Sequence, residues 1–228
     1  MRASWGYKLT LFGLFALAYA LFYQYPNLHP IWQPVYLPLL TLDLAIPFLP
    51  SSFLIYISDY IFFMTIIAIH HDIGSYNQFA RTCFVTLIAC GLFFLFYPTS
   101  YPRPDYPITD NFLVNLVMSA IQAADTPNNC FPSLHVALSA VGAISLRNFS
   151  PKVRVLFWTW ALLIFVSTLT TKQHYVLDVV AGISVALFVA FLDRLYERYL
   201  LERVTKVFSF SKSVQHIHSS HQTTRHLK

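Results

Sequence analysis

Long runs of hydrophobic residues, separated by short polar stretches, dominate the pattern along the chain. Six runs are candidate membrane-spanning helices, at residues 9–23, 53–69, 82–97, 133–146, 155–171 and 175–192. Some are shorter than the roughly 20 residues that a spanning helix needs, but flanking aromatic residues lengthen them. The weakest is the run 133–146, which we include because it is too apolar for a water-exposed helix. The pattern predicts an all-α bundle of six transmembrane helices.

The first run has features of a secretory signal peptide. Arg2 and Lys8 precede it, and the small residues Ala18 and Ala20 could mark a cleavage site. The apolar run nevertheless continues past Ala20 through Tyr23, so we expect an uncleaved first span.

The composition supports the membrane assignment. The chain is 56% hydrophobic and 11% charged, against about 25% charged residues in an average soluble domain. We expect an integral, multi-pass membrane protein with one membrane domain at residues 1–203 and a polar cytoplasmic tail at residues 204–228. The tail contains four histidines that could bind metal weakly, although a solvated tail is the simpler interpretation: His216, His218, His221 and His226.

The basic residues predict how the chain is oriented. With six spans, only Arg103 and Lys172 of the fifteen Lys and Arg residues fall on the outer side. The positive-inside rule therefore places both termini in the cytoplasm. The net charge of +5 follows from this topology, and no basic stripe with interleaved aromatic residues indicates nucleic-acid binding.

Three separate stretches bring polar residues to the outer side of the predicted bundle. Arg103 follows the third span, and Lys172 lies in the turn between the fifth and sixth spans. His135 follows "CFPS" at the outer end of the fourth span, where an isolated histidine would more often cap or pack a helix. The meeting of three stretches at one membrane face favours a functional site.

His174 and Asp178 are spaced i and i+4, so they share a face of the sixth helix. A carboxylate that binds one imidazole nitrogen fixes the tautomer and leaves the other nitrogen as a nucleophile or base. A buried carboxylate in a membrane helix also needs a partner. The pair alone is equally compatible with catalysis and with a neutral hydrogen bond that pins the fifth and sixth spans together.

Two histidines, a carboxylate and two cations together suit metal-free phosphoryl transfer. The cations would hold the phosphate oxygens, while one histidine attacks phosphorus and the other protonates the departing oxygen. Ser133 could add a hydroxyl, and the first-turn amides of the helix after Pro132 form a natural anion site. We predict no metal and no cofactor.

Three motifs resemble those of the type-2 phosphatidic acid phosphatase superfamily: "PRP" at 102–104, "PSLH" at 132–135 and "HYVLD" at 174–178. Each motif alone is weak, but the ordered set is specific and the resemblance covers most of the chain. The resemblance implies that His174 is the phosphorylated nucleophile, Asp178 its orienting partner and His135 the general acid. It also implies that Arg103, Ser133 and, as a substitute cation, Lys172 bind phosphate.

The chain departs from the commonest family pattern in ways that bear on the reaction. Phe96 stands where a lysine usually precedes the Arg-Pro, Ser167-Thr168 stands where the third motif usually has Ser-Arg, and "PSLH" replaces Pro-Ser-Gly-His. Together with the stretch 42–58, these features are similar to the branch with inositol phosphorylceramide and sphingomyelin synthases. Simple hydrolysis is therefore not the only reaction to consider.

We expect an enzyme that hydrolyses a lipid phosphate ester at the exoplasmic face, in the inner (plasma) membrane of a bacterium. One alternative is a phosphotransferase, because the apolar outer segment 24–52 could shield the site from water. Its polar residues Gln33, Thr41 and Asp43 form no cluster ready to bind a polyol, which favours water as the acceptor. The other alternative is a non-catalytic scaffold or transporter. Asp59, inside the second span, is costly in lipid unless it is paired or faces a wet cavity, and its role stays open.

Overall fold

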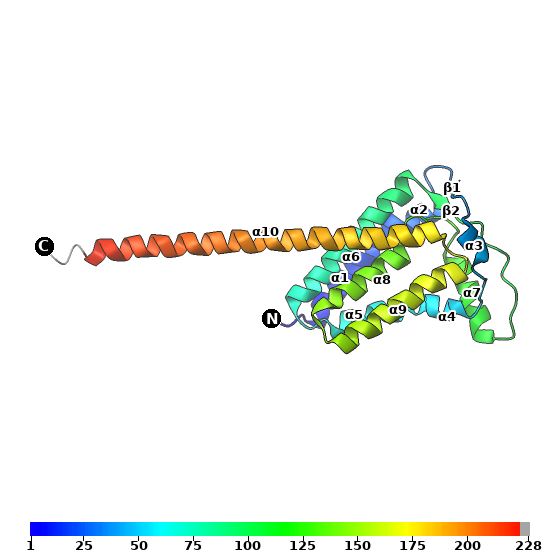
Figure 1. Ribbon diagram of the computed structural model, residues 1–228, viewed down its shortest axis with the longest axis horizontal. Helices are drawn as coiled ribbons and strands as arrows, with labels where there is room; N and C mark the ends of the chain where they lie inside the picture. The colour runs from blue at the N-terminus through cyan, green and yellow to red at the C-terminus, as the bar shows by residue number, and fades with distance from the viewer. Residues whose placement is uncertain (224–228) are drawn as a thin grey trace. The chain divides into compact units, whose positions relative to one another are not determined.

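The computed structural model describes the backbone of residues 1–223 and the side chains of residues 1–203. The chain forms two compact units, residues 1–190 and 191–228, and the following description concerns the first (Figure 1). The elements in chain order are α1 (Trp5–Tyr19), a π-helical turn η1 (Ala20–Gln24), α2 (Tyr25–Leu28), β1 (Val35–Tyr36), α3 (Thr41–Ala45), α4 (Ser52–Ile57), α5 (Asp59–Ile69), α6 (Ile73–Phe96), β2 (Thr99–Ser100), α7 (Phe112–Ala124), α8 (Leu134–Ser145), a 3₁₀ turn η2 (Leu146–Asn148), α9 (Pro151–Thr170) and α10 (Val176–Thr223).

The second unit is described only as the C-terminal part of helix α10, up to Thr223. The predicted boundary after residue 203 lies within this helix and stays a prediction. The tail histidines His216, His218, His221 and His226 lie outside the residues whose side chains are described, so their role stays a prediction as well.

Five helical segments are long and apolar enough to cross a membrane: Trp5–Leu28, Ser52–Ile69, Ile73–Phe96, Pro151–Thr170 and Val176–Arg203. They correspond to five of the six runs predicted from the sequence. The remaining run forms α8, whose 12 residues span only about 18 Å at 1.5 Å per residue, against a hydrocarbon core of about 30 Å. The all-helical membrane class is therefore supported, while length alone identifies five spans.

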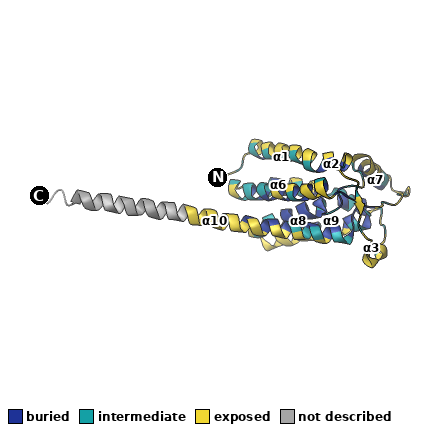
Figure 2. Ribbon diagram, turned by 90° about the horizontal axis from the view of Figure 1, so that it is seen from above, coloured by how far each residue is buried: buried dark blue, intermediate teal, exposed yellow. Residues whose placement is uncertain are grey.

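Helix α8 is the core of the bundle, as the dark blue ribbon in Figure 2 shows. It packs between α6 and α9, and glycines let α5 and α10 approach it closely as well. A Cβ added to Gly142 would lie 2.7 Å from Ile66 Cδ1, and one added to Gly182 of α10 would lie 2.6 Å from the carbonyl oxygen of Ser133. Gly182 therefore allows α10 to lie directly against the start of α8.

Residues 98–132 contain a helix, α7, that the hydrophobic pattern did not predict. Helix α7 is amphipathic, and its buried face packs against Phe53 and Tyr56 of α4. The apolar positions Val114, Val117 and Ile121 recur every three or four residues, which is the helical period. The segment covers one side of α4.

The first outer segment, residues 24–52, is fastened over the turn between α9 and α10. Lys172 Nζ donates to the carbonyl oxygens of Asp43 (2.8 Å) and Ile46 (2.6 Å). In return, Asp43 Oδ1 accepts from the backbone N–H of Val176 (2.7 Å) at the start of α10, while Oδ2 accepts from that of Leu40 (2.8 Å). These four hydrogen bonds, here called the α3 brace, fix the turn that contains His174.

The α3 brace generates a prediction about Lys172. Lys172→Met removes two charge-assisted hydrogen bonds, so we expect the free energy of unfolding to fall by about 1–3 kcal/mol, measured by thermal unfolding in detergent micelles. Lys152→Met, which removes an exposed lysine of α9, is the matched control and should leave stability unchanged. Unchanged stability in Lys172→Met, combined with weaker phosphate affinity, would contradict the structural role and support the phosphate-binding role predicted from the sequence.

Candidate active site

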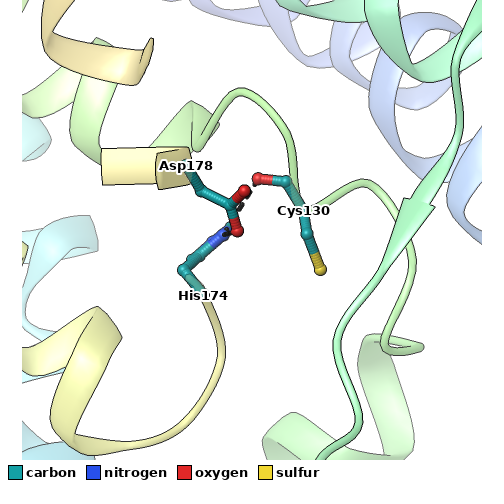
Figure 3. Close-up of side chains that lie close together, drawn as sticks. All are labelled: Cys130, His174 and Asp178. Carbon is teal, nitrogen blue, oxygen red and sulfur yellow. Dashed lines mark hydrogen bonds and ion pairs between the residues drawn. The ribbon is translucent and has the colours of Figure 1, made fainter. Parts of the chain in front are cut away.

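The imidazole of His174 is held by two acceptors on one nitrogen. Its Nδ1 lies 3.2 Å from Asp178 Oδ2 and 3.0 Å from the carbonyl oxygen of Cys130, and Figure 3 shows all three groups converging. Because a carbonyl oxygen and an ionised carboxylate can only accept, Nδ1 must carry the hydrogen. The lone pair of the neutral ring is then on Nε2. The two acceptors on Nδ1 therefore leave Nε2 as the nitrogen with the free lone pair.

Asp178 is also held in place by hydrogen bonds with the backbone. The carboxylate oxygen that faces His174 also accepts from the backbone N–H of Tyr175 (2.9 Å), and the carbonyl oxygen of Asp178 accepts from the backbone N–H of Ser133 (3.1 Å). The turn before α10 is closed by Thr168, whose carbonyl oxygen accepts from the N–H of His174 (3.3 Å). The second and third motifs are thus joined by the backbone hydrogen bond between Ser133 and Asp178, and the imidazole has little freedom to rotate.

Cys130, His174 and Asp178 could together offer three ligand atoms to a metal ion, because these atoms lie within 4.8 Å of one another. Two observations favour the hydrogen-bonded pair instead. The sulfur of Cys130 is turned away from the other two side chains in Figure 3, and it lies 3.2 Å from the carbonyl oxygen of Pro127. Burial also raises the pKa of the Cys130 thiol well above its usual value, which disfavours the thiolate that binds metals.

His135 lies in the first turn of α8, next to His174. The two ring centroids are 6.3 Å apart, with the planes at 60°. The Nδ1 of His135 lies 3.3 Å from the hydroxyl of Tyr56, and the two rings are also in contact, with centroids 4.6 Å apart. The two histidines therefore meet as predicted. Tyr56, from α4, was missed because an aromatic residue in an apolar helix normally indicates packing.

Arg103 is brought to the same region by the strand β2 and the residues after it. Tyr101, two residues earlier, packs edge-on against Tyr175, with ring centroids 4.6 Å apart. The hydroxyl of Tyr175, which adjoins His174, donates to the carbonyl oxygen of Ser100 (3.0 Å). The first and third motifs therefore lie side by side.

The guanidinium of Arg103 is occupied on one side by Asp125. It donates to the carboxylate Oδ2 of Asp125 (2.8 Å) and to the carbonyl oxygen of the same residue (2.8 Å). Burial alone would lower the pKa of Arg103, but Asp125 outweighs it and holds the pKa above its usual value. The Nε atom is buried without a hydrogen-bond partner among the described residues. Sequence reasoning gave no signal for Asp125, because an acidic residue in a polar loop is ordinarily solvated.

The two remaining predicted phosphate ligands differ in position. Ser133 is fully buried at the N-terminus of α8, where its Oγ accepts from the backbone N–H of Val136 (3.4 Å). Its hydroxyl hydrogen therefore remains available to another acceptor. The ammonium of Lys172, by contrast, binds the two carbonyls of the α3 brace. The structure brings His174, Asp178 and Ser133 together, and the contacts of Lys172 do not support the predicted phosphate-binding role.

Comparison with known families agrees with this geometry. The model of the PAP2 superfamily, the type-2 phosphatidic acid phosphatases, matches residues 52–192. The matched region contains all three motifs and more than half of the chain, while α1 and α3, with Asp43, lie outside it. No curated protein matches the chain at a significant level. The residues, their arrangement and the family match together show that this chain belongs to the PAP2 superfamily.

Proposed function

We propose that the protein is an integral-membrane lipid phosphate phosphatase that works through a phosphohistidine on His174. The observation that carries this proposal is the pair of acceptors on His174 Nδ1, Asp178 Oδ2 at 3.2 Å and the Cys130 carbonyl at 3.0 Å. They leave the Nε2 lone pair free on the side opposite the carboxylate. Membership of the PAP2 superfamily supports a phosphatase or phosphotransferase that acts on lipids.

In the first step, Nε2 of His174 attacks phosphorus and the bond from phosphorus to the lipid oxygen breaks. His135, which takes up a proton when the phosphate dianion binds beside it, donates that proton to the lipid oxygen, so the lipid leaves as a neutral alcohol. Asp178 stabilises the positive charge that develops on the His174 ring. In the second step, water attacks the phosphohistidine while His135 accepts the water proton, which releases inorganic phosphate and restores both histidines.

The transferred phosphoryl group needs hydrogen-bond donors that do not already have partners. Arg103 offers its unpartnered Nε, and Ser133 offers its hydroxyl hydrogen. The first-turn N–H groups of α8 add the partial positive charge of a helix N-terminus. We propose that the phosphate also competes with Asp125 for the guanidinium, since an anion with two negative charges attracts Arg103 more strongly than one carboxylate does. These groups supply the charge stabilisation without a metal or other cofactor.

We propose that α8 completes six membrane crossings and that both termini are cytoplasmic. Helix α8 is too short to cross alone, but α6 and α9 surround it, and the outer segments supply protein rather than lipid at its ends. Arg103 and Lys172 are the basic residues on the site side of the bundle, which by the positive-inside rule is the outer side. The site then faces the exoplasm, or the periplasm if the protein belongs to a bacterial inner membrane.

The acceptor of the phosphoryl group distinguishes a phosphatase from a phosphotransferase. The α3 brace covers the turn that contains His174, which is the kind of shield that would favour an alcohol over water. However, both carboxylate oxygens of Asp43 are already used by backbone N–H groups. Gln33 and Thr41 of the same segment are exposed. The segment therefore has no free polar cluster to bind a polyol, and we favour water.

The roles of the two histidines can be separated by their variants. His174→Ala should abolish both turnover and the acid-labile phosphoenzyme that labelled lipid phosphate forms. His135→Ala should lower kcat by roughly 10²–10⁴-fold for a lipid phosphate, and much less for an aryl phosphate whose leaving group needs little protonation. Steady-state kinetics in detergent with EDTA present measure both effects. Equal losses for the two substrates, or activity that needs magnesium, would contradict the mechanism. A scaffold or transporter would form no phosphoenzyme at all.

The acceptor can be identified from the products. With labelled lipid phosphate, alone and with added lipid alcohols, the purified protein should release inorganic phosphate as the main product under both conditions. Chromatography of the lipid and aqueous phases measures the partition. A labelled phosphodiester, or a new lipid phosphate with negligible inorganic phosphate, would instead identify a phosphotransferase.

A further inference from the structure

We propose that an apolar groove next to His135 binds the hydrocarbon chain of the substrate, and that Asp59 in its wall selects lipids with a hydroxyl or ammonium group close to the phosphate. This inference rests on the proposed function, because it assigns a substrate class to the same site. It adds a binding site and a specificity-determining residue that the three motifs do not include.

The groove is a cavity of about 280 Å³ between α1, α5, α6 and α8. Its walls are almost entirely aromatic and aliphatic, and they include Leu11 and Phe15 of α1, Phe63 of α5 and Phe84 of α6. No Lys or Arg lines it, so it is unsuited to the phosphate group itself. It is suited to a hydrocarbon chain, because burying apolar surface there is favourable and requires no polar partner.

The groove is continuous with the candidate active site. Leu134 and His135, in the first turn of α8, are among its lining residues. Along α1 the lining extends from Leu11 to Tyr19, which corresponds to about 12 Å of helix. A lipid whose phosphate lies between the two histidines can therefore place its chain along α1 without leaving the protein surface. This continuity identifies the occupant as the substrate's own chain.

Asp59 is the one carboxylate that lines this groove. It is only 9% exposed, and its Oδ1 lies 2.8 Å from the hydroxyl of Ser139. Its other oxygen, Oδ2, has no hydrogen bond to any residue that the structure describes. Oδ2 is accessible from the groove, because it is not among the fully buried atoms without partners. A hydrogen-bond donor on the ligand would give it a partner in surroundings that are otherwise apolar.

The role of Oδ2 as an acceptor does not depend on the charge of Asp59. The hydroxyl of Ser139 lies 2.7 Å from the carbonyl oxygen of His135 as well as 2.8 Å from Asp59 Oδ1. A hydroxyl has one hydrogen and a carbonyl can only accept, so the Ser139 hydroxyl donates to the carbonyl of His135. Its bond with Asp59 then needs a proton on Asp59 Oδ1, which donates to the Ser139 oxygen. Oδ2 is then a carbonyl-type oxygen, and in the ionised state it is a carboxylate oxygen. In both states it accepts.

The position of Asp59 defines where the ligand's donor must be. Ser139 lies one turn after His135 on α8, about 6 Å further along the helix axis, and Asp59 is bound to Ser139. A donor on the carbon next to the one that bears the phosphate, a few bonds from phosphorus, lies within this reach. A hydroxyl or ammonium group at that carbon fits, whereas a lipid phosphate with only hydrocarbon or ester groups there leaves Oδ2 unsatisfied.

The test compares two single-chain lipid phosphates that differ by one group, lysophosphatidic acid with its free 2-hydroxyl and its 2-deoxy analogue of the same chain. The wild-type protein should prefer the hydroxyl compound at least about tenfold in kcat/KM. Asp59→Leu should reduce this ratio to about one, because it removes the acceptor. Asp59→Asn, which keeps an acceptor oxygen, should retain a clear preference, and Asp105→Leu, at an exposed carboxylate, should behave as wild type.

Measuring the binding of the same two lipids, without turnover, distinguishes this inference from the proposed function. Dissociation constants of the two lipids for His174→Gln, which cannot form the phosphohistidine, should also differ about tenfold, and the double variant with Asp59→Leu should bind both equally. A wild-type protein that uses both lipids equally, or an Asp59→Leu variant with an undiminished preference, would overturn the inference. Neither result would contradict the proposed phosphatase function. If the protein binds the two lipids selectively but turns over neither, the proposed phosphatase function is wrong, while the lipid-binding site at Asp59 is still supported.

The hydrocarbon part of the proposal has its own test. Ala80→Trp places a large side chain in the groove from α6, so the KM for a long-chain substrate should rise at least tenfold while that for a short-chain analogue stays unchanged. Leu162→Trp, on the exposed face of α9, is the matched control and should change neither value. Equal effects on long and short chains, or no effect on either, would show that the chain lies elsewhere.

Discussion

The hydrogen bond from His174 Nδ1 to Asp178 and to the Cys130 carbonyl is the interaction on which the account of this protein depends. It converts a histidine, which in water exchanges its proton between two nitrogens, into a residue with one tautomer and one reactive nitrogen. The acceptors come from two different parts of the chain, since Cys130 precedes α8 and Asp178 lies in α10. The reactive nitrogen is therefore defined only when the two helices are correctly packed.

Several features of the fold serve this packing. Gly182 lets α10 lie against the carbonyl of Ser133, where any side chain would collide. The N–H of Ser133 in turn binds the carbonyl of Asp178. Asp43 and Lys172 hold the turn before α10 through the α3 brace. Two charged residues thus position a histidine, and α8 carries Ser133 and His135 at its N-terminal end.

The sequence predicted the features that follow from local pattern. Hydrophobic runs predicted the long helices, and the i and i+4 spacing of His174 and Asp178 predicted their contact. The convergence of His135 and His174 followed from placing their motifs at one end of the bundle. These predictions succeeded because each depends on helical periodicity or on the side of the membrane, both of which are readable from one sequence.

The contacts that the sequence did not predict are all long-range and involve residues with several plausible partners. Lys172 looked like a phosphate ligand because it is two residues from His174, but its side chain extends to carbonyls more than a hundred residues earlier in the chain. Asp125 and Tyr56 lie outside the motifs, and nothing in their local sequence indicates that they contact Arg103 and His135. The run 133–146 was predicted as a sixth span, but α8 has only 12 residues and most of them are buried in protein, so length alone does not identify it as one.

The most direct test of the central claim is to identify which nitrogen of His174 is phosphorylated. Phosphoenzyme trapped from labelled lipid phosphate can be digested in alkali, and the two isomers of phosphohistidine separate by chromatography. The account predicts that the phosphoryl group is on Nε2 of His174, because Nδ1 carries the hydrogen bonded to Asp178 and Cys130. Phosphorylation at Nδ1, or on a residue other than His174, would contradict it.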